Sequence, residues 1–228
     1  FNRDGKLDLA VGLFEANHVV ILIGDGAGRF AVGRRTAVGT HPVSIAVGDF
    51  DKDGALDLAV ANLDSDDVHI LAGNGTGGFR VASSFPAGNG PSSIAVGDLN
   101  QDGDLDLAVA NRFSNDVQVF LASRGRFRLA SSATPGEGPR RVLIADFNND
   151  GLLDLAVGNR VSSSVFIMLG KGRGLFGSFM PYFVTPRLGN IEAGDFDGDG
   201  DLDIAVSNTE ILNIITVLVN RGNGRFLQ

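Results

Sequence analysis

One nine-residue block recurs through the chain at steps of 48 or 49 residues. It reads DFDKDGALD at 49–57, DLNQDGDLD at 98–106, DFNNDGLLD at 146–154 and DFDGDGDLD at 195–203, and the chain opens on the same block without its first Asp. In repeat proteins of this period, each unit buries its apolar faces against its neighbours. A nine-residue period would instead have indicated a calcium-binding β-roll. The chain is therefore predicted to be an array of similar supersecondary units.

Each unit contains four short apolar segments separated by turn-forming residues. In the second unit they are VSIAVG at 43–48, LDLAVAN at 56–62, DVHILAG at 67–73 and FRVASSF at 79–85. Segments of this length, rich in Val, Ile and Leu and bounded by Gly, Asn, Asp or Pro, are typical of β-strands. Four such strands per repeat predict one blade of a β-propeller.

We predict an all-β, single-domain propeller of about five four-stranded blades, of which the first and last are incomplete. Nothing precedes Phe1 to serve as a first strand, and the chain stops early in the last fourth strand. Three expectations remain open: a fragment of a larger propeller, for example a seven-bladed one; a compact five-bladed ring; or self-association of two chains through exposed strand edges. The approximate units are 1–42, 43–91, 92–140, 141–189 and 190–228.

The recurring block, called the acidic loop below, places oxygen donors at alternate positions. Side-chain oxygens stand at positions 1, 3, 5 and 9, a glycine at position 6, and a backbone carbonyl is available at position 7. Ca²⁺ accepts six to eight oxygens in irregular geometry, whereas Mg²⁺ resists dehydration and Zn²⁺ prefers His or Cys. An EF-hand does not fit, because position 12 is a valine such as Val60 and the flanks predict strands. The alternative is a metal-free Asp-Gly turn between strands.

The segment DFDGDGDLDIAVSN at 195–208, with NRGNGRF at 220–226, resembles the FG-GAP/VCBS repeats of integrin-like β-propellers. The resemblance covers essentially the whole chain. It implies calcium loops that join the first and second strands of each blade at one rim. The ligands it implies are Asp49, Asp51, Asp53, Ala55 and Asp57; Asp98, Asn100, Asp102, Asp104 and Asp106; Asp146, Asn148, Asp150, Leu152 and Asp154; and Asp195, Asp197, Asp199, Asp201 and Asp203.

The first acidic loop lacks position 1 and offers only Asn2, Asp4, the Lys6 carbonyl and Asp8. We therefore expect about four bound Ca²⁺ ions, and a fifth only if this shortened loop also binds. The formal net charge of −8 agrees with this number, since four Ca²⁺ would neutralise it. The same charge argues against a nucleic-acid partner, and the chain has no apolar run of 18 residues that would predict a membrane span.

Catalytic motifs are not apparent in the sequence. His18, His41 and His69 occupy different offsets of the repeat, so no histidine-based triad is predicted. Glutamate is scarce, which leaves no clear acid–base pair, and the absence of cysteine excludes a thiol nucleophile. Repetition of the acidic loop in every unit favours a structural role for the metal. The chain is therefore predicted not to be an enzyme.

Loops after the second strand of each unit vary most in sequence, and the resemblance puts them on the rim opposite the calcium loops. Variable loops on a fixed scaffold are typical of binding faces. Aromatic residues and arginine are frequent anchors of interfaces, so Phe14, Arg112, Phe113 and Arg160 are the candidate ligand-binding residues. The pairs Arg34–Arg35 and Arg140–Arg141 suggest a patch for an anionic ligand, but we expect them to be solvated surface.

These observations together predict a non-catalytic, calcium-binding propeller that acts as an extracellular recognition or adhesion scaffold. Its partner would be a protein or glycan on the rim opposite the calcium loops. Two alternatives are a lectin-like, carbohydrate-binding propeller and an accessory propeller domain of a larger secreted enzyme. An extracellular or cell-surface location is expected because sites of this kind often bind calcium at about 10⁻⁴–10⁻³ M.

Overall fold

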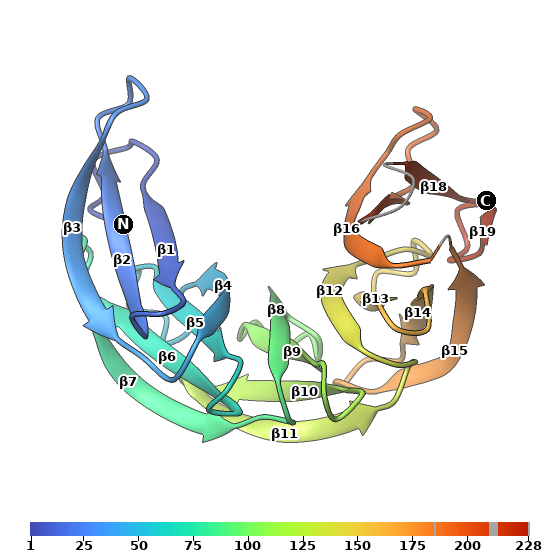
Figure 1. Cartoon of the computed structure of the whole chain (residues 1–228), viewed down its shortest axis with the longest axis horizontal. Coiled ribbons are helices and arrows are strands. Elements are labelled where there is room, and N and C mark those ends of the chain that lie inside the picture. Colours follow the sequence, from blue (N-terminus) through green and yellow to red (C-terminus); the bar gives the residue numbers. More distant parts are fainter. Residues whose placement is uncertain (185, 210–213, 228) are drawn as a thin grey trace.

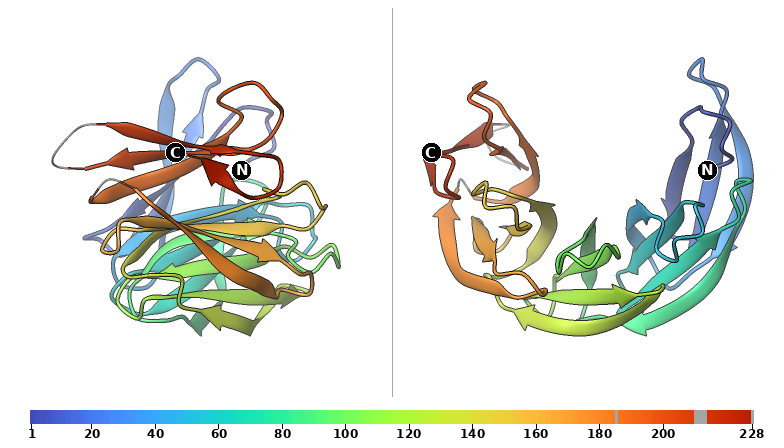
Figure 2. Two further views of the ribbon diagram at one scale, coloured as in Figure 1. Left: turned by 90° about the vertical axis from the view of Figure 1, so that its right-hand side faces the viewer. Right: turned by 180° about the vertical axis from the view of Figure 1, so that it is seen from behind.

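The computed structural model describes residues 1–184, 186–209 and 214–227, which form five antiparallel sheets of consecutive strands. This confirms the predicted all-β propeller of repeated blades. Successive sheets lie side by side around an arc, with the two termini in the blades at its opposite ends (Figure 1). Seen from the edge, the sheets are stacked face to face (Figure 2). The five blades thus form an open arc and not the compact five-bladed ring that was one of the three expectations.

The strands follow the repeat closely. The first blade contains β1 (Leu9–Leu13), β2 (His18–Gly24) and β3 (Phe30–Ala37). The second contains β4 (Pro42–Gly48), β5 (Asp57–Asn62), β6 (Asp67–Gly73) and β7 (Phe79–Pro86). The third contains β8 (Pro91–Gly97), β9 (Asp106–Asn111), β10 (Asp116–Ser123) and β11 (Arg126–Ala133). The fourth contains β12 (Pro139–Ala145), β13 (Asp154–Asn159), β14 (Ser164–Gly170) and β15 (Phe176–Phe183). The fifth contains β16 (Leu188–Gly194), β17 (Asp203–Asn208), β18 (Ile215–Asn220) and β19 (Phe226–Leu227).

The innermost strands of the arc are β4, β8, β12 and β16, and β3, β7, β11 and β15 form its outer edge (Figure 1). The first blade has three strands because it begins at the second strand of the repeat, as expected. None of the described residues forms a helix that is long and apolar enough to cross a membrane.

The hydrophobic core lies between the blades, and each second strand contributes to two interfaces. On β5, Leu58 and Val60 pack with Val19 and Ile21 of the first blade. Ala59 and Ala61, which point to the other face of the same strand, pack with residues of the third blade. All four β5 residues are fully buried. A strand covered on both faces must be apolar throughout, which explains the unbroken LAV or IAV run that follows every acidic loop.

Candidate metal loops and a basic pocket

The acidic loops connect the first strand of each complete blade to the second, for example β4 to β5. All of them therefore lie at the edge of the arc where the inner strands end. Their tight path depends on left-handed backbone at positions 4 and 6: φ is 61° at Lys52 and 83° at Gly54. Glycine removes the steric cost of that conformation at position 6.

Within the four complete loops, backbone amides hold the carboxylate of position 1 in place. Asp49 accepts hydrogen bonds from the N–H groups of Asp53 at 3.1 Å and Gly54 at 2.9 Å. The same two bonds recur in the third loop at Asp98 and in the fourth at Asp146. The loop backbone thus holds this side chain in position through hydrogen bonds of its own.

Two of the loops bring three carboxylates together. In the second loop, one oxygen each of Asp49, Asp51 and Asp57 lies within 4.8 Å of the others. In the fifth loop, Asp195, Asp197 and Asp203 do the same. Neither group includes the carboxylate of position 5, Asp53 or Asp199, which instead accepts the backbone N–H two residues later. Three oxygens at this spacing match the oxygen-rich shell that a hard divalent cation requires.

The third and fourth loops carry asparagine at position 3. The side-chain amide of Asn100 donates to Asp102 at 2.9 Å, and that of Asn148 donates to Asp150 at 3.0 Å. Positions 3 and 5, which the sequence assigns to one ion, are therefore adjacent in both loops. In the shortened first loop, Asn2 and Asp4 form the equivalent contact at 3.0 Å.

Position 9 has a second role that the spacing of the loop did not predict. The buried carboxylate of Asp57 accepts from the N–H of Phe50 at 3.0 Å and from that of Gly73, the last residue of β6, at 2.8 Å. It therefore joins the start of the acidic loop to the end of the third strand. The same pair of bonds is made by Asp8, Asp106, Asp154 and Asp203. The only signal in the sequence was an acidic residue at the first position of a buried strand.

Burial makes two of these position-9 carboxylates costly to ionise. Burial, and then the negative charges of neighbouring loop carboxylates, raise the pKa of Asp106 and of Asp154 to about 6, although backbone hydrogen bonds oppose the shift. The pKa of Asp57 is raised for the same reasons. A bound cation would offset this desolvation and repulsion.

The four candidate ligand-binding residues do not form a single site. Phe14, in the turn after β1, stacks on His41 at a ring-centroid distance of 4.1 Å. Arg112 and Phe113 follow β9 in the third blade, where the Arg112 guanidinium lies 5.5 Å from the Phe113 ring centroid. The Phe113 side chain is 58% exposed. Arg160 follows β13 in the fourth blade and acts electrostatically on Arg140, as does Arg112.

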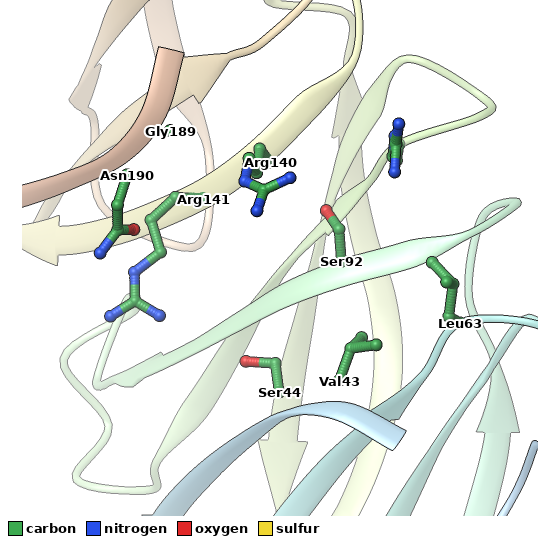
Figure 3. A pocket seen from close by; sticks show the side chains of 9 residues that line it. Val43, Ser44, Leu63, Ser92, Arg140, Arg141, Gly189 and Asn190 are labelled. Carbon is green, nitrogen blue, oxygen red and sulfur yellow. The ribbon is translucent and has the colours of Figure 1, made fainter. Parts of the chain in front are cut away.

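A cavity of about 300 Å³, called the basic pocket below, lies where the inner strands begin. This is the edge opposite the acidic loops, and several inner strands contribute to it. Figure 3 shows Arg140 and Arg141 of β12 on one side of the pocket, and Ser92 of β8 and Ser44 of β4 on the other. The lining residues are Val43, Ser44, Leu63, Ser92, Arg112, Arg140, Arg141, Gly189 and Asn190.

Arg140 and Arg141 are half-buried and are not the solvated surface that we expected, whereas Arg112, the third arginine of the basic pocket, is exposed. Arg141 pairs with Glu192 of β16 at 3.2 Å, yet its buried Nε has no hydrogen-bond partner among the described residues. Burial, and then the positive charges of Arg160 and Arg112, lower the pKa of Arg140. The sequence contained the Arg140–Arg141 pair, but only the fold brings Arg112 beside it from another blade.

Comparison with protein families identifies the repeat. A family model described as FG-GAP-like repeat matches residues 1–60, 49–109, 98–157 and 146–206, so that the matches overlap along most of the chain. No curated protein sequence matches the chain.

Several solved structures share the fold at low sequence identity. A protein from Bacteroides uniformis assigned as a 6-phosphogluconolactonase superposes with a TM-score of 0.74 at 11% identity, covering 96% of this chain and 66% of the other. A second protein of that assignment, from Bacteroides fragilis, gives 0.73 at 16%, covering 99% and 67%. The periplasmic gluconolactonase of Pseudomonas aeruginosa gives 0.66 at 18%, covering 92% and 63%. This chain thus spans about two thirds of the length of these neighbours.

These neighbours contradict the functional prediction made from the sequence. A non-catalytic recognition or adhesion scaffold, with its lectin-like and accessory-domain alternatives, was inferred from repetition of the acidic loop and from the lack of a histidine triad. Proteins named for lactonase activity nevertheless share this fold. Repeated loops at one edge say nothing about chemistry at the opposite edge, because a propeller is a scaffold that carries its sites independently of its architecture.

Proposed function

Because the chain belongs to the family of FG-GAP-like repeats, we propose that its acidic loops bind Ca²⁺ and clamp the first and second strands of each blade. About four ions bind to the complete loops, and a fifth binds if the shortened first loop is competent. The observation that carries the proposal is the gathering of three carboxylate oxygens within 4.8 Å in the second and fifth loops. Such groups repel one another unless a cation neutralises them.

The hydrogen bonds of the loops support calcium rather than a smaller ion. Each loop carboxylate is held by backbone amides, and a position-7 carbonyl such as that of Ala55 supplies neutral oxygen without further charge. A chain-supplied oxygen set of irregular geometry suits Ca²⁺, whereas Mg²⁺ retains its waters. Affinities of about 10⁻⁴–10⁻³ M, usual for extracellular calcium modules, favour a working environment outside the cytoplasm.

Ion counting tests this proposal. Calorimetric titration of metal-depleted protein with Ca²⁺ is expected to show about four sites, and each change Asp53→Ala, Asp102→Ala, Asp150→Ala or Asp199→Ala is expected to remove about one. The reason is that each variant removes a predicted ligand from one acidic loop and leaves the other loops unchanged. The matched control is Glu137→Ala, since Glu137 is an exposed carboxylate outside the acidic loops. Equal stoichiometry for Glu137→Ala and the four loop variants would contradict the assignment.

A second candidate function, hydrolysis of a sugar lactone, is favoured by the basic pocket together with the names of the structural neighbours. In this reaction water adds to the lactone carbonyl carbon, the ring C–O bond breaks and a hydroxy acid is released. An arginine such as Arg140 would stabilise the oxyanion that develops at the carbonyl. Glu192, which accepts hydrogen bonds from Arg141 at 3.2 Å and Asn190 at 3.1 Å, would take the proton from water and pass it to the departing ring oxygen.

A proton-release assay with gluconolactone and its 6-phosphate tests this candidate. Wild-type protein is expected to exceed the spontaneous rate, and Glu192→Gln is expected to lower the enzymatic rate by about 10²-fold or more because it removes the proton acceptor. Glu15→Gln, a change at an exposed carboxylate of the first blade, is expected to have no effect. Hydrolysis at the buffer rate by wild-type protein would exclude a lactonase role.

A further inference from the structure

At the equivalent positions of the inner strands that line the basic pocket, only the fourth blade carries arginine. The first residues of the inner strands correspond along the repeat, and after the leading residue of each strand the pairing with the second strand shifts by one residue. The bulged position is Val43 in β4, Ser92 in β8, Arg140 in β12 and Gly189 in β16. A bulge of this kind re-aims a side chain out of the ladder. Arginine is therefore not required there by the architecture.

The residue after the bulge shows the same departure. Arg141 stands where the other inner strands carry Ser44, Ser93 or Asn190. Ser44 and Ser93 accept a backbone N–H bond from the next inner strand, at Ile94 and Val142 respectively. Arginine cannot accept such a bond, because its guanidinium carries only donors. At this position the fourth blade thus carries a cationic side chain instead of a hydroxyl acceptor that links neighbouring blades.

Charge in the basic pocket is not balanced by the chain. The net charge of the protein is −8, yet Arg112, Arg140 and Arg141 converge on one cavity. Glu192 pairs with Arg141, while neither Arg112 nor Arg140 forms an ion pair with a carboxylate in the described part of the chain. Arg140 and Arg141 are half-buried, and the positive charge of Arg112 acts on Arg140. An external anion would relieve the repulsion among these guanidinium groups.

One of the lining residues also has an unused hydrogen-bond donor. The buried Nε of Arg141 has no acceptor among the described residues. A planar guanidinium offers several donors in a fixed fork that matches the oxygens of a carboxylate or phosphate. A cavity of about 300 Å³ is of the size that holds a small metabolite.

We propose that the basic pocket binds a small anionic metabolite whose carboxylate or phosphate group is held by Arg140 and Arg112, with Arg141 Nε as an additional donor. The shared chemistry is an oxyanion attached to a polar body that fits beside Ser92 and Asn190. This binding is independent of calcium at the opposite edge, and it does not require the pocket to be catalytic.

Calorimetry on calcium-loaded protein at constant ionic strength tests the proposal with three probes: glucose 6-phosphate, glucuronate and neutral glucose. We expect at least one anion to bind and glucose not to bind. Stronger binding of glucose 6-phosphate identifies a phosphate site, stronger binding of glucuronate identifies a carboxylate site, and equal binding supports general oxyanion recognition. Binding of neither anion, or equal binding of glucose, would overturn the proposal.

Two variants locate the site. Arg140→Gln is expected to weaken binding of the preferred anion by about tenfold or more, in keeping with loss of a charge-assisted hydrogen bond. Arg112→Gln, a change at an exposed loop residue, is expected to act in the same direction. Arg35→Gln is the control, because Arg35 is exposed on β3 and its loss changes the net charge equally. Equal weakening by Arg35→Gln and Arg140→Gln would indicate non-specific attraction and overturn the assignment.

Discussion

EDTA is expected to lower the melting temperature of the calcium-loaded chain by more than about 10 °C, and excess Ca²⁺ is expected to restore it. Each site adds about 2.7 kcal/mol of stability when free calcium is about 100 times its Kd. About four sites therefore contribute on the order of 10 kcal/mol, and each 1 kcal/mol shifts the melting temperature of a chain of this size by about 2–4 °C. Thermal unfolding followed by circular dichroism measures the change.

The control for this experiment separates calcium from general screening of charge. Mg²⁺ at the same concentration screens the loop carboxylates equally but cannot replace its waters as readily, so it is expected to restore only a minor part of the stability. An unchanged melt after EDTA treatment would contradict the calcium proposal. Full recovery with Mg²⁺ would show that the loops need divalent charge but do not select calcium.

Phe147→Ala is expected to destabilise the chain by about 3–5 kcal/mol, the usual cost of removing a fully buried phenylalanine. Phe147 occupies position 2 of the fourth acidic loop and is 0% exposed. It packs into the interface between the fourth and fifth blades, with its ring 5.9 Å from that of Phe226. Its loss would therefore leave a cavity between two blades. Urea unfolding in calcium-containing buffer measures the effect.

Phe196→Ala is the matched control, because Phe196 occupies the same position of the fifth loop. Its side chain is 52% exposed, since no described blade follows the fifth. The expected loss is below about 1 kcal/mol, in proportion to the smaller apolar area that is buried. Equal destabilisation by the two variants would show that position 2 acts through the loop itself and not through packing between blades.

The repeat was readable from the sequence because it is a local pattern. The apolar run of β5 and the Asp-Gly turns of the acidic loops depend on backbone conformations and strand lengths that neighbouring residues determine. The fold class, the four-stranded blades and the connection between first and second strands were therefore predicted correctly. The assignment of the loop oxygens to calcium, made from the same local spacing, stays a prediction for the titration to test.

What the local pattern could not predict depends on contacts between blades. The bond from Asp57 to the end of β6 crosses 16 residues of chain, and the approach of Arg112 to Arg140 joins two blades. Variation among the loops predicted a binding role for Arg112, whereas Arg140 was expected to be solvated. The burial of Arg140 depends on the strands on either side of it, which a single repeat unit does not reveal.

The blade and its acidic loop follow from the local sequence, since both arise from interactions within one 48- or 49-residue unit. The residues that share the basic pocket come together only in the folded chain, because the start of β12 and the loop after β9 meet only when the blades are arranged around an axis. The same arrangement decided that Phe147 is core and Phe196 is surface, although the repeat treats them alike. Burial in a propeller depends on the neighbouring blade, and the sequence of a single repeat unit carries no information about that neighbour.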